Sequence, residues 1–313
     1  MTCRDAKIAF NLLVDRMRAR NETILVEIQF MKSILPSLAM LWLSLFFHAA
    51  SMGSDFITLQ RQDSKQVPMR AYKPVQSECK GIAIISHGAG GSESGYRYLG
   101  QAMSHFGYLA VVVGHQESGL QSVQEMVRGK TIAQGLAKLI TDTKAYQARF
   151  MDIRAAKDWA QTQCLGKEAV LIGHSMGAAT VMMAAGAQNL LTVPEMPEFA
   201  AYIALSPQGS GAIFPENAWH AIQHPVLMLT GTQDLELGGL SWETRTEAFK
   251  NMKAGCKWLG VIKGATHMNF AGLGASQKTE TITVQVIQDF LKGVQANDCK
   301  PTIQATDLIL SVK

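Results

Sequence analysis

The feature that most constrains the fold of this chain is a series of short, uninterrupted apolar runs with longer amphipathic stretches between them. Residues 81–86 (GIAIIS), 108–113 (YLAVVV) and 169–173 (AVLIG) are the clearest of these runs. Runs that are apolar at nearly every position are typical of strands buried on both faces, as in parallel sheets. Further runs fit the same pattern at residues 201–206, 225–230 and 258–263.

Helical periodicity fills the stretches between these runs. Apolar side chains recur at helical spacing over residues 146–160 and again over residues 286–294. Strands that alternate with helices predict an α/β fold with a doubly wound, mostly parallel sheet. With an opening antiparallel pair at residues 56–60 and 68–72, we expect eight strands in a single domain over residues 54–298. The remaining residues, 299–313, are expected to form a C-terminal tail.

The N-terminal region has the layout of a secretory signal peptide. Met31 and Lys32 form a charged start, and residues 34–47 are free of charge and mostly apolar. Small residues follow at 49–51 and 53. A membrane span needs about 20 apolar residues, so this run is short for one. We therefore predict a signal peptide at residues 31–51, preceded by an extension at 1–30 that lies upstream of the true start. The alternative is an uncleaved N-terminal anchor.

Charge and motif content argue against several classes of partner. The net charge of +4 is small and spread along the 313 residues, without a Lys/Arg cluster that would suggest nucleic acid. The sequence has no HExxH motif, no paired Cys/His spacing and no G-x-x-x-x-G-K-[ST] loop for phosphates. We therefore expect no metal, no organic cofactor and no nucleic-acid partner, and we expect a monomer.

The strongest local signal is the sequence GHSMG at residues 173–177. It follows an apolar strand and precedes a helix-compatible run, which is the context of a G-x-S-x-G nucleophile elbow. Side chains at Gly173 and Gly177 would collide with neighbouring backbone in such a turn. The turn lifts the Ser175 hydroxyl above the sheet, which makes Ser175 the candidate nucleophile. The alternative is a tight turn in which Ser175 only caps the helix.

A second glycine-rich segment, HGAGG at residues 87–91, follows the strand at 81–86. A loop of this kind can bring a backbone N–H group close to the oxygen of a substrate that gains negative charge. We expect Ala89 N–H to be the first donor of this oxyanion hole and Met176 N–H the second. The imidazole of His87 is expected to be structural.

An acid and a base should follow the nucleophile in the order Ser, acid, His. Asp234 comes directly after the strand at 225–230 and its GTQ turn, and His267 follows the strand that ends near residue 263. Loops that leave the carboxyl ends of parallel strands meet at one edge of the sheet, where ligands bind. We therefore predict His267 as the general base and Asp234 as its partner, with Glu236 as the alternative acid.

These motifs together resemble the α/β-hydrolase superfamily. The residues that carry the resemblance are 87–91, 173–177, Asp234 and the GATH segment at 264–267, and it extends over residues 54 to about 298. Within the superfamily, the RFMDI segment at 149–153 looks like the dienelactone-hydrolase-like branch, next to platelet-activating-factor acetylhydrolases and bacterial polyester hydrolases. Dienelactone hydrolases proper use a Cys nucleophile, so their lactone substrates are not carried over.

Four cysteines follow the predicted signal peptide. An even number in an exported chain suggests disulfides. Cys79 and Cys164 each precede a strand, and in this fold the two strands are parallel neighbours, so we pair them. Cys256 would pair with Cys299, which is similar to a C-terminal disulfide of secreted polyester hydrolases. Buried free thiols are the alternative for both pairs.

The resemblance implies a serine hydrolase that cleaves a small-molecule carboxylic ester through an acyl-enzyme. The predicted signal peptide implies that it is secreted or periplasmic, without stable insertion into a membrane after signal cleavage. The stretch at 116–143 is longer than a simple connection and is expected to contact the substrate, whereas the short link at 207–224 leaves little room for a large lid. The alternatives are an amidase or peptidase with the same triad, and a non-catalytic binding protein on a hydrolase scaffold.

Overall fold

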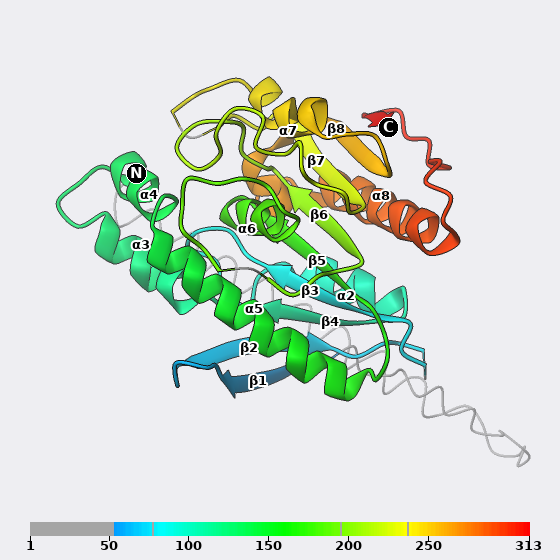
Figure 1. The fold of residues 1–313 in the computed structure, drawn as a ribbon, viewed down its shortest axis with the longest axis horizontal. Helices are drawn as coiled ribbons and strands as arrows, with labels where there is room; N and C mark the ends of the chain where they lie inside the picture. Colours follow the sequence, from blue (N-terminus) through cyan, green and yellow to red (C-terminus); the bar gives the residue numbers. More distant parts are fainter. Residues whose placement is uncertain (1–52, 77, 195, 237) are drawn as a thin grey trace, which may run out of the picture. The chain divides into compact units, whose positions relative to one another are not determined.

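A nine-stranded mixed sheet forms the centre of the molecule (Figure 1). The computed structural model describes residues 53–313 except 77, 195 and 237, so the predicted extension at 1–30 and the predicted signal peptide lie outside the described residues. The strand order is β1-β2-β4-β3-β5-β6-β7-β8-β9. The strands are β1 Asp55–Gln60, β2 Gln66–Tyr72, β3 Gly81–Ser86, β4 Tyr108–Val113, β5 Ala169–His174, β6 Ala201–Leu205, β7 Val226–Gln233, β8 Lys257–Thr266 and β9 Leu308–Val312.

The six strands from β3 to β8 are parallel, which confirms the predicted α/β class with a mostly parallel sheet. β1 and β2 form the expected antiparallel pair at one side. The central strands β3, β4, β5 and β6 are buried at every position, as their continuous apolar runs indicated.

The sheet has one strand more than the eight expected. β9, Leu308–Val312, lies in the segment predicted to be a tail and pairs antiparallel with β8 at the far edge. Its residues are exposed or half-buried, with none fully buried. Its apolar run, residues 308–310, is shorter than the apolar runs of the buried strands, so the sequence prediction placed it in the tail.

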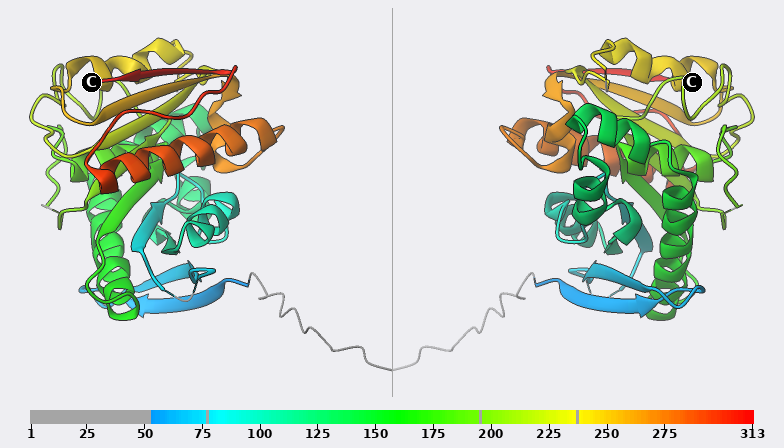
Figure 2. Two further views of the ribbon diagram at one scale, coloured as in Figure 1. Left: turned by 90° about the vertical axis from the view of Figure 1, so that its right-hand side faces the viewer. Right: turned by 90° about the vertical axis from the view of Figure 1, so that its left-hand side faces the viewer.

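Helices cover both faces of the sheet (Figures 1 and 2). α5 and α6 pack against one face, and α2 and α8 pack against the other. The two faces bury separate apolar clusters, with Phe150 and Ile153 of α5 in the first and Val286 and Phe290 of α8 in the second. The α-helices are α2 Arg97–His105, α3 Leu120–Met126, α4 Ile132–Leu139, α5 Thr143–Gln163, α6 Met176–Ala184, α7 Glu247–Asn251 and α8 Gln277–Ala296, and the 3-10 helices are η1 Gln116–Ser118, η2 Trp242–Thr246 and η3 His267–Ala271.

The long connection between β4 and α5 folds into η1, α3 and α4. It lies beside the glycine-rich loop after β3, because Gly90 N–H donates to the carbonyl oxygen of Ser118 and a Cβ on Gly90 would approach the Val123 side chain to 3.3 Å. This connection therefore borders the edge of the sheet at which the strands β3 and β4 end.

Both predicted disulfides are present. Cys79–Cys164 joins the segment before β3 to the end of α5, and Cys256–Cys299 joins the start of β8 to the segment after α8. Both pairings are thereby confirmed over the alternative of free thiols. Across the described part of the chain, no helix has the length and apolar character that a membrane crossing requires.

Candidate active site

Ser175 occupies the turn between β5 and α6 in a backbone conformation that non-glycine residues rarely adopt, with φ 56° and ψ −117°. The glycines on either side make this turn possible. A Cβ on Gly173 would lie 2.2 Å from the Gly177 carbonyl oxygen, and a Cβ on Gly177 would lie 2.1 Å from the Ser86 carbonyl oxygen. The expected collision with backbone is thus confirmed at both positions, and the turn presents a partly exposed Ser175 at the edge of the sheet.

The structure brings the three predicted residues of the triad together. Ser175 Oγ lies 2.8 Å from His267 Nε2, and His267 Nδ1 lies 2.9 Å from Asp234 Oδ1. Because a carboxylate can only accept, Nδ1 carries the ring proton and the lone pair of Nε2 faces the Ser175 hydroxyl. The three residues follow β5, β7 and β8, whose carboxyl ends share one edge of the sheet.

The Asp234 carboxylate is fully buried and hydrogen-bonded at both oxygens. Oδ2 accepts from the Thr230 hydroxyl at 2.9 Å, and Oδ1 also lies 2.9 Å from Arg245 Nε. Burial acts to raise the pKa of Asp234, but the hydrogen bond from His267 and the charge of Arg245 outweigh burial and leave the pKa lowered. The carboxylate therefore stays ionised at neutral pH, as a partner for a protonated imidazole must.

The glycine-rich loop lies against the candidate nucleophile. A Cβ on Gly88 would stand 3.2 Å from the Cβ of Ser175, so only a glycine leaves this space open. The N–H groups of Gly88, Gly90 and Gly91 all donate to other protein groups. Among the residues that the structure describes, none accepts a hydrogen bond from Ala89 N–H. Ala89 is thus the loop residue whose donor is available beside Ser175.

Met176 is the first residue of α6 and provides a second available donor. The first four N–H groups of a helix have no acceptor within the helix, and the amino end of a helix carries a partial positive charge. The first bond of α6 runs from Ala179 N–H to the Ser175 carbonyl oxygen. Met176 directly follows Ser175 in the chain, and Ala89 directly follows Gly88, which packs against Ser175.

The buried His174 ring links two segments of the site by hydrogen bonds. Its Nε2–H donates to the carbonyl oxygen of His267 at 3.0 Å, so its Nδ1 accepts from the Tyr96 hydroxyl at 2.7 Å. The same hydroxyl accepts from Gly88 N–H at 3.1 Å. Burial lowers the pKa of His174 well below its usual value, so the ring is neutral. Tyr96 and His174 thereby connect the glycine-rich loop to the loop that carries His267.

A buried arginine on α5 holds the other side of the glycine-rich loop. Arg149 Nη1 donates to the His87 carbonyl oxygen at 2.7 Å and to the Ser86 hydroxyl at 3.1 Å, and its Nε donates to the Ser118 hydroxyl at 2.9 Å. Arg149 begins the RFMDI segment on which part of the resemblance rests. His87 Nε2 accepts from the backbone N–H of His115 at 3.0 Å, in agreement with its expected structural role.

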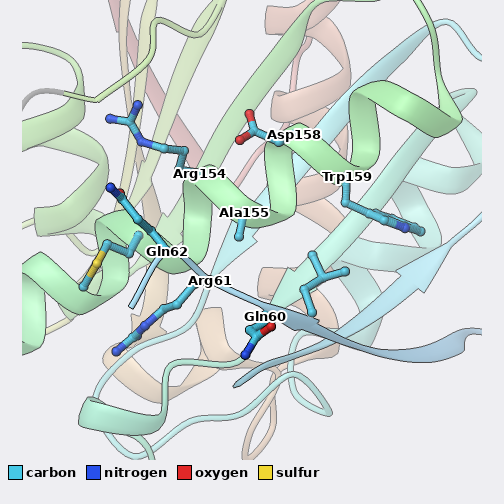
Figure 3. A pocket seen from close by; sticks show the side chains of 9 residues that line it. Gln60, Arg61, Gln62, Arg154, Ala155, Asp158 and Trp159 are labelled. Atoms are coloured by element: carbon cyan, nitrogen blue, oxygen red, sulfur yellow. The ribbon is translucent and has the colours of Figure 1, made fainter. Parts of the chain in front are cut away.

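The Asp of the same segment continues this polar cluster away from the site. Asp152 accepts from His115 Nδ1 at 2.9 Å and from Arg61 Nη1 at 2.7 Å, and Arg61 also contacts Glu117. Figure 3 shows the outer end of the cluster, where Arg61 lies beside α5 in a pocket that Trp159 also lines. Since none of the residues that line this pocket belongs to the triad, the pocket is separate from the Ser175 cluster.

Sequence reasoning did not find Arg245, Thr230 or Tyr96. Arg245 donates mostly to backbone carbonyl oxygens, and Tyr96 contacts His174 in a distant segment. Thr230 contacts Asp234 four residues later, but no motif marks this pair. The alternative acid, Glu236, accepts from Gly209 N–H at 2.9 Å, while the His267 ring bonds Asp234. Within the described residues, no group of three or more His, Cys, Asp or Glu side chains could hold a metal ion.

Comparisons with known proteins bear on the fold. No family model matches the chain, and no curated protein matches it. Among solved structures, a dienelactone hydrolase from Anabaena variabilis matches with a TM-score of 0.56 at 17% identity, over 77% of this chain and 97% of that one. The chain has the α/β-hydrolase fold.

Two further structures share the α/β-hydrolase fold with this chain. An alpha-beta serine hydrolase homologue from Coxiella burnetii gives a TM-score of 0.53 at 18% identity, over 74% of this chain and 95% of that one. A cold-adapted esterase from an Arctic intertidal metagenomic library gives 0.52 at 16% identity, over 75% and 92%. The predicted resemblance is confirmed at the level of fold, with a dienelactone hydrolase and an esterase among the structural neighbours.

Proposed function

We propose that this protein is a serine hydrolase that cleaves carboxylic esters, with Ser175 as nucleophile, His267 as general base and Asp234 as the acid that orients it. The observation that carries the proposal is the 2.8 Å contact between Ser175 Oγ and His267 Nε2, at a serine that a strained turn presents to solvent. A serine hydroxyl is a weak nucleophile, and an imidazole at this distance can take its proton as it attacks.

The reaction would run as acyl transfer to water. Ser175 Oγ attacks the ester carbonyl carbon and His267 takes the hydroxyl proton, while the N–H groups of Ala89 and Met176 stabilise the negative oxygen. His267 then gives the proton to the leaving alcohol, which leaves the acyl group on Ser175. His267 then takes a proton from water, whose oxygen attacks the acyl carbon. The bond from the acyl carbon to Ser175 Oγ breaks, His267 returns the proton to Ser175 Oγ, and the carboxylic acid leaves. Each oxyanion donor of this kind contributes about 3–4 kcal/mol to the barrier reduction.

The substrate class rests on what borders the site. The link between β6 and β7, residues 206–225, contains no helix, so a small or extended ester can reach Ser175 without displacing a helical lid in this link. We also propose that the protein is exported, because its two disulfides fit an oxidising compartment. A small-molecule ester is accordingly the proposed partner, and the proposed state is a monomer.

Labelling with a fluorophosphonate probe tests the proposal. We expect wild-type protein to incorporate one probe per chain at Ser175 and to hydrolyse p-nitrophenyl acetate faster than a matched anilide. Ser175→Ala should lose both signals while keeping its melting temperature. A folded wild-type protein that never labels would contradict the proposal and favour a non-catalytic binding protein. Faster cleavage of the anilide would instead identify an amidase or peptidase.

A further inference from the structure

The buried guanidinium of Arg245, in η2, contacts the candidate acid Asp234. It is 2% exposed, and it donates to four carbonyl oxygens, those of Ser206, Pro207, Asp234 and Leu235, at 2.8–3.1 Å. These contacts join the segment after β6 to the segment after β7. A guanidinium with this many acceptors is fixed in place, and it keeps its charge at every working pH.

The charged side chain of Arg245 contacts one oxygen of the Asp234 carboxylate, Oδ1. Its Nε lies 2.9 Å from Asp234 Oδ1, the same oxygen that accepts the proton of His267 Nδ1 at 2.9 Å. The other oxygen, Oδ2, accepts from the uncharged hydroxyl of Thr230 at 2.9 Å. The carboxylate atom on which the imidazole depends is thus shared with a fixed positive charge.

The other groups around this pair leave Arg245 as the dominant positive charge. The His174 ring, 4.7 Å from the His267 ring, is held neutral by burial. Glu236 is half-buried, and its negative charge acts to raise the pKa of Arg245. Its Oε1 accepts from Gly209 N–H. From the turn after β5, Ser175 contributes an uncharged hydroxyl.

A shared carboxylate stabilises an imidazolium less than an isolated one does. In a Ser-His-Asp triad the carboxylate favours the protonated ring, which helps the transition state but also lets the ring take up a proton from acidic solvent. A cation paired with the carboxylate cancels part of the negative potential at the imidazole ring, so it weakens both the stabilisation of the transition state and the uptake of a proton from solvent. The cancellation is strong because charges interact more strongly in a buried site.

We propose that Arg245 is a positioning residue that holds Asp234 in place and weakens its hold on a protonated His267, so that the site keeps a neutral base, and hence activity, at lower pH than Asp234 alone would allow. This inference rests on the proposed function. It predicts that the charge of Arg245 sets the pH at which activity falls on the acidic side of the pH–rate profile. If Arg245 only held the backbone in place, its replacement would not move that pH.

Three variants separate charge from contact. Arg245→Gln removes the charge and keeps two N–H donors, Arg245→Lys keeps the charge, and Glu236→Gln removes a nearby negative charge while leaving Arg245 in place. The measurement is kcat/KM for p-nitrophenyl acetate from pH 4 to 9, with the melting temperature recorded for each variant.

We expect the half-point of the acidic limb to rise by about one pH unit in Arg245→Gln, which is a tenfold change in the protonation equilibrium. Arg245→Lys should stay near wild type, and Glu236→Gln should move the half-point downward. An unchanged half-point in Arg245→Gln, an equal shift in Arg245→Lys or an upward shift in Glu236→Gln would overturn the inference. If Arg245→Gln does not fold, the other two variants decide the question.

A readout without turnover keeps the two proposals distinct. The ring-proton NMR signals of His267 can be followed against pH in wild-type and variant protein. A wild-type protein that neither labels nor hydrolyses esters contradicts the proposed function. If its His267 titration still moves upward in Arg245→Gln, the electrostatic role of Arg245 stands on its own. If the titration does not move, the inference fails whether or not the protein is an esterase.

Discussion

Ser175 shows how a single residue in the site is held against its own preference. Its positive φ costs on the order of 1–3 kcal/mol, and surrounding structure has to impose it. The imposing contacts are those of two glycines: Gly173 meets the Gly177 backbone, and Gly177 meets the end of β3. The strain is thus maintained by the close packing of α6 on the sheet, so the geometry of the candidate nucleophile depends on backbone atoms outside the candidate triad.

Substitution at Gly177 tests this dependence. Gly177→Ala places a methyl group 2.1 Å from a carbonyl oxygen, so the turn or the start of α6 must move. We expect a loss of stability of at least about 2–3 kcal/mol, as for an overpacked core, together with loss of fluorophosphonate labelling. Urea unfolding and labelling measure the two effects. Gly95→Ala is the matched control, because its added Cβ meets its nearest neighbour at an ordinary 3.4 Å. Equal stability of both variants would argue against the packing account.

At the level of elements, the strands ending at one edge of the sheet bring together residues that the sequence keeps far apart. Asp234 and His267 could be predicted because each follows a recognisable buried strand, and Ser175 because a motif surrounds it. Arg245 could not be predicted, since a buried arginine that donates to backbone carbonyl oxygens leaves no local pattern. Tyr96 could not be predicted because it bonds His174, far away in the sequence. β9 was missed for a different reason, because its apolar run at residues 308–310 is short and lies in an exposed edge strand near the end of the chain.

Helix α5 makes an element-scale contribution through Arg149, which ties the glycine-rich loop to η1. Arg149→Met leaves the His87 carbonyl oxygen and two hydroxyl groups without this donor. We expect a loss of about 2–4 kcal/mol of stability, since each unsatisfied buried group costs about 1–3 kcal/mol. We also expect kcat to fall by up to about a hundredfold with little change in KM, because Ala89 N–H, the proposed oxyanion donor, would move.

Steady-state kinetics and urea unfolding test the role of Arg149. Gln161→Ala, an exposed position on the same helix, serves as the control and should behave as wild type in both measurements. A variant that loses stability but keeps kcat would show that Arg149 supports the fold and leaves the oxyanion hole undisturbed.

The molecule as a whole buries several groups whose protonation links its stability to pH. Burial lowers the pKa of His87, His115 and His174 well below the 6.5 of an unperturbed histidine. An unfolded chain would take up these protons near pH 6.5 and the folded chain would not, so their contribution to stability is present above pH 6.5 and is lost as pH falls. Asp152 acts in the opposite sense, because burial raises its pKa from 3.8 to about 7 and its contribution is lost as pH rises through 7.

The net balance predicts marked sensitivity to acid. Three histidines take up protons on unfolding and Asp152 gives one up, so unfolding between pH 6 and pH 5 should bind about two protons. Each bound proton changes the free energy of unfolding by about 1.4 kcal/mol per pH unit, which gives a loss of about 3 kcal/mol per unit. A domain with a typical stability of about 5–15 kcal/mol would then unfold within a few pH units of neutrality.

Urea unfolding at a series of pH values measures the slope of the free energy of unfolding against pH, and calorimetry in buffers of different ionisation enthalpy counts the protons directly. His105→Gln, at an exposed position on α2, should leave the slope as it is, whereas a wild-type slope near zero would mean that the buried rings are protonated in the folded state.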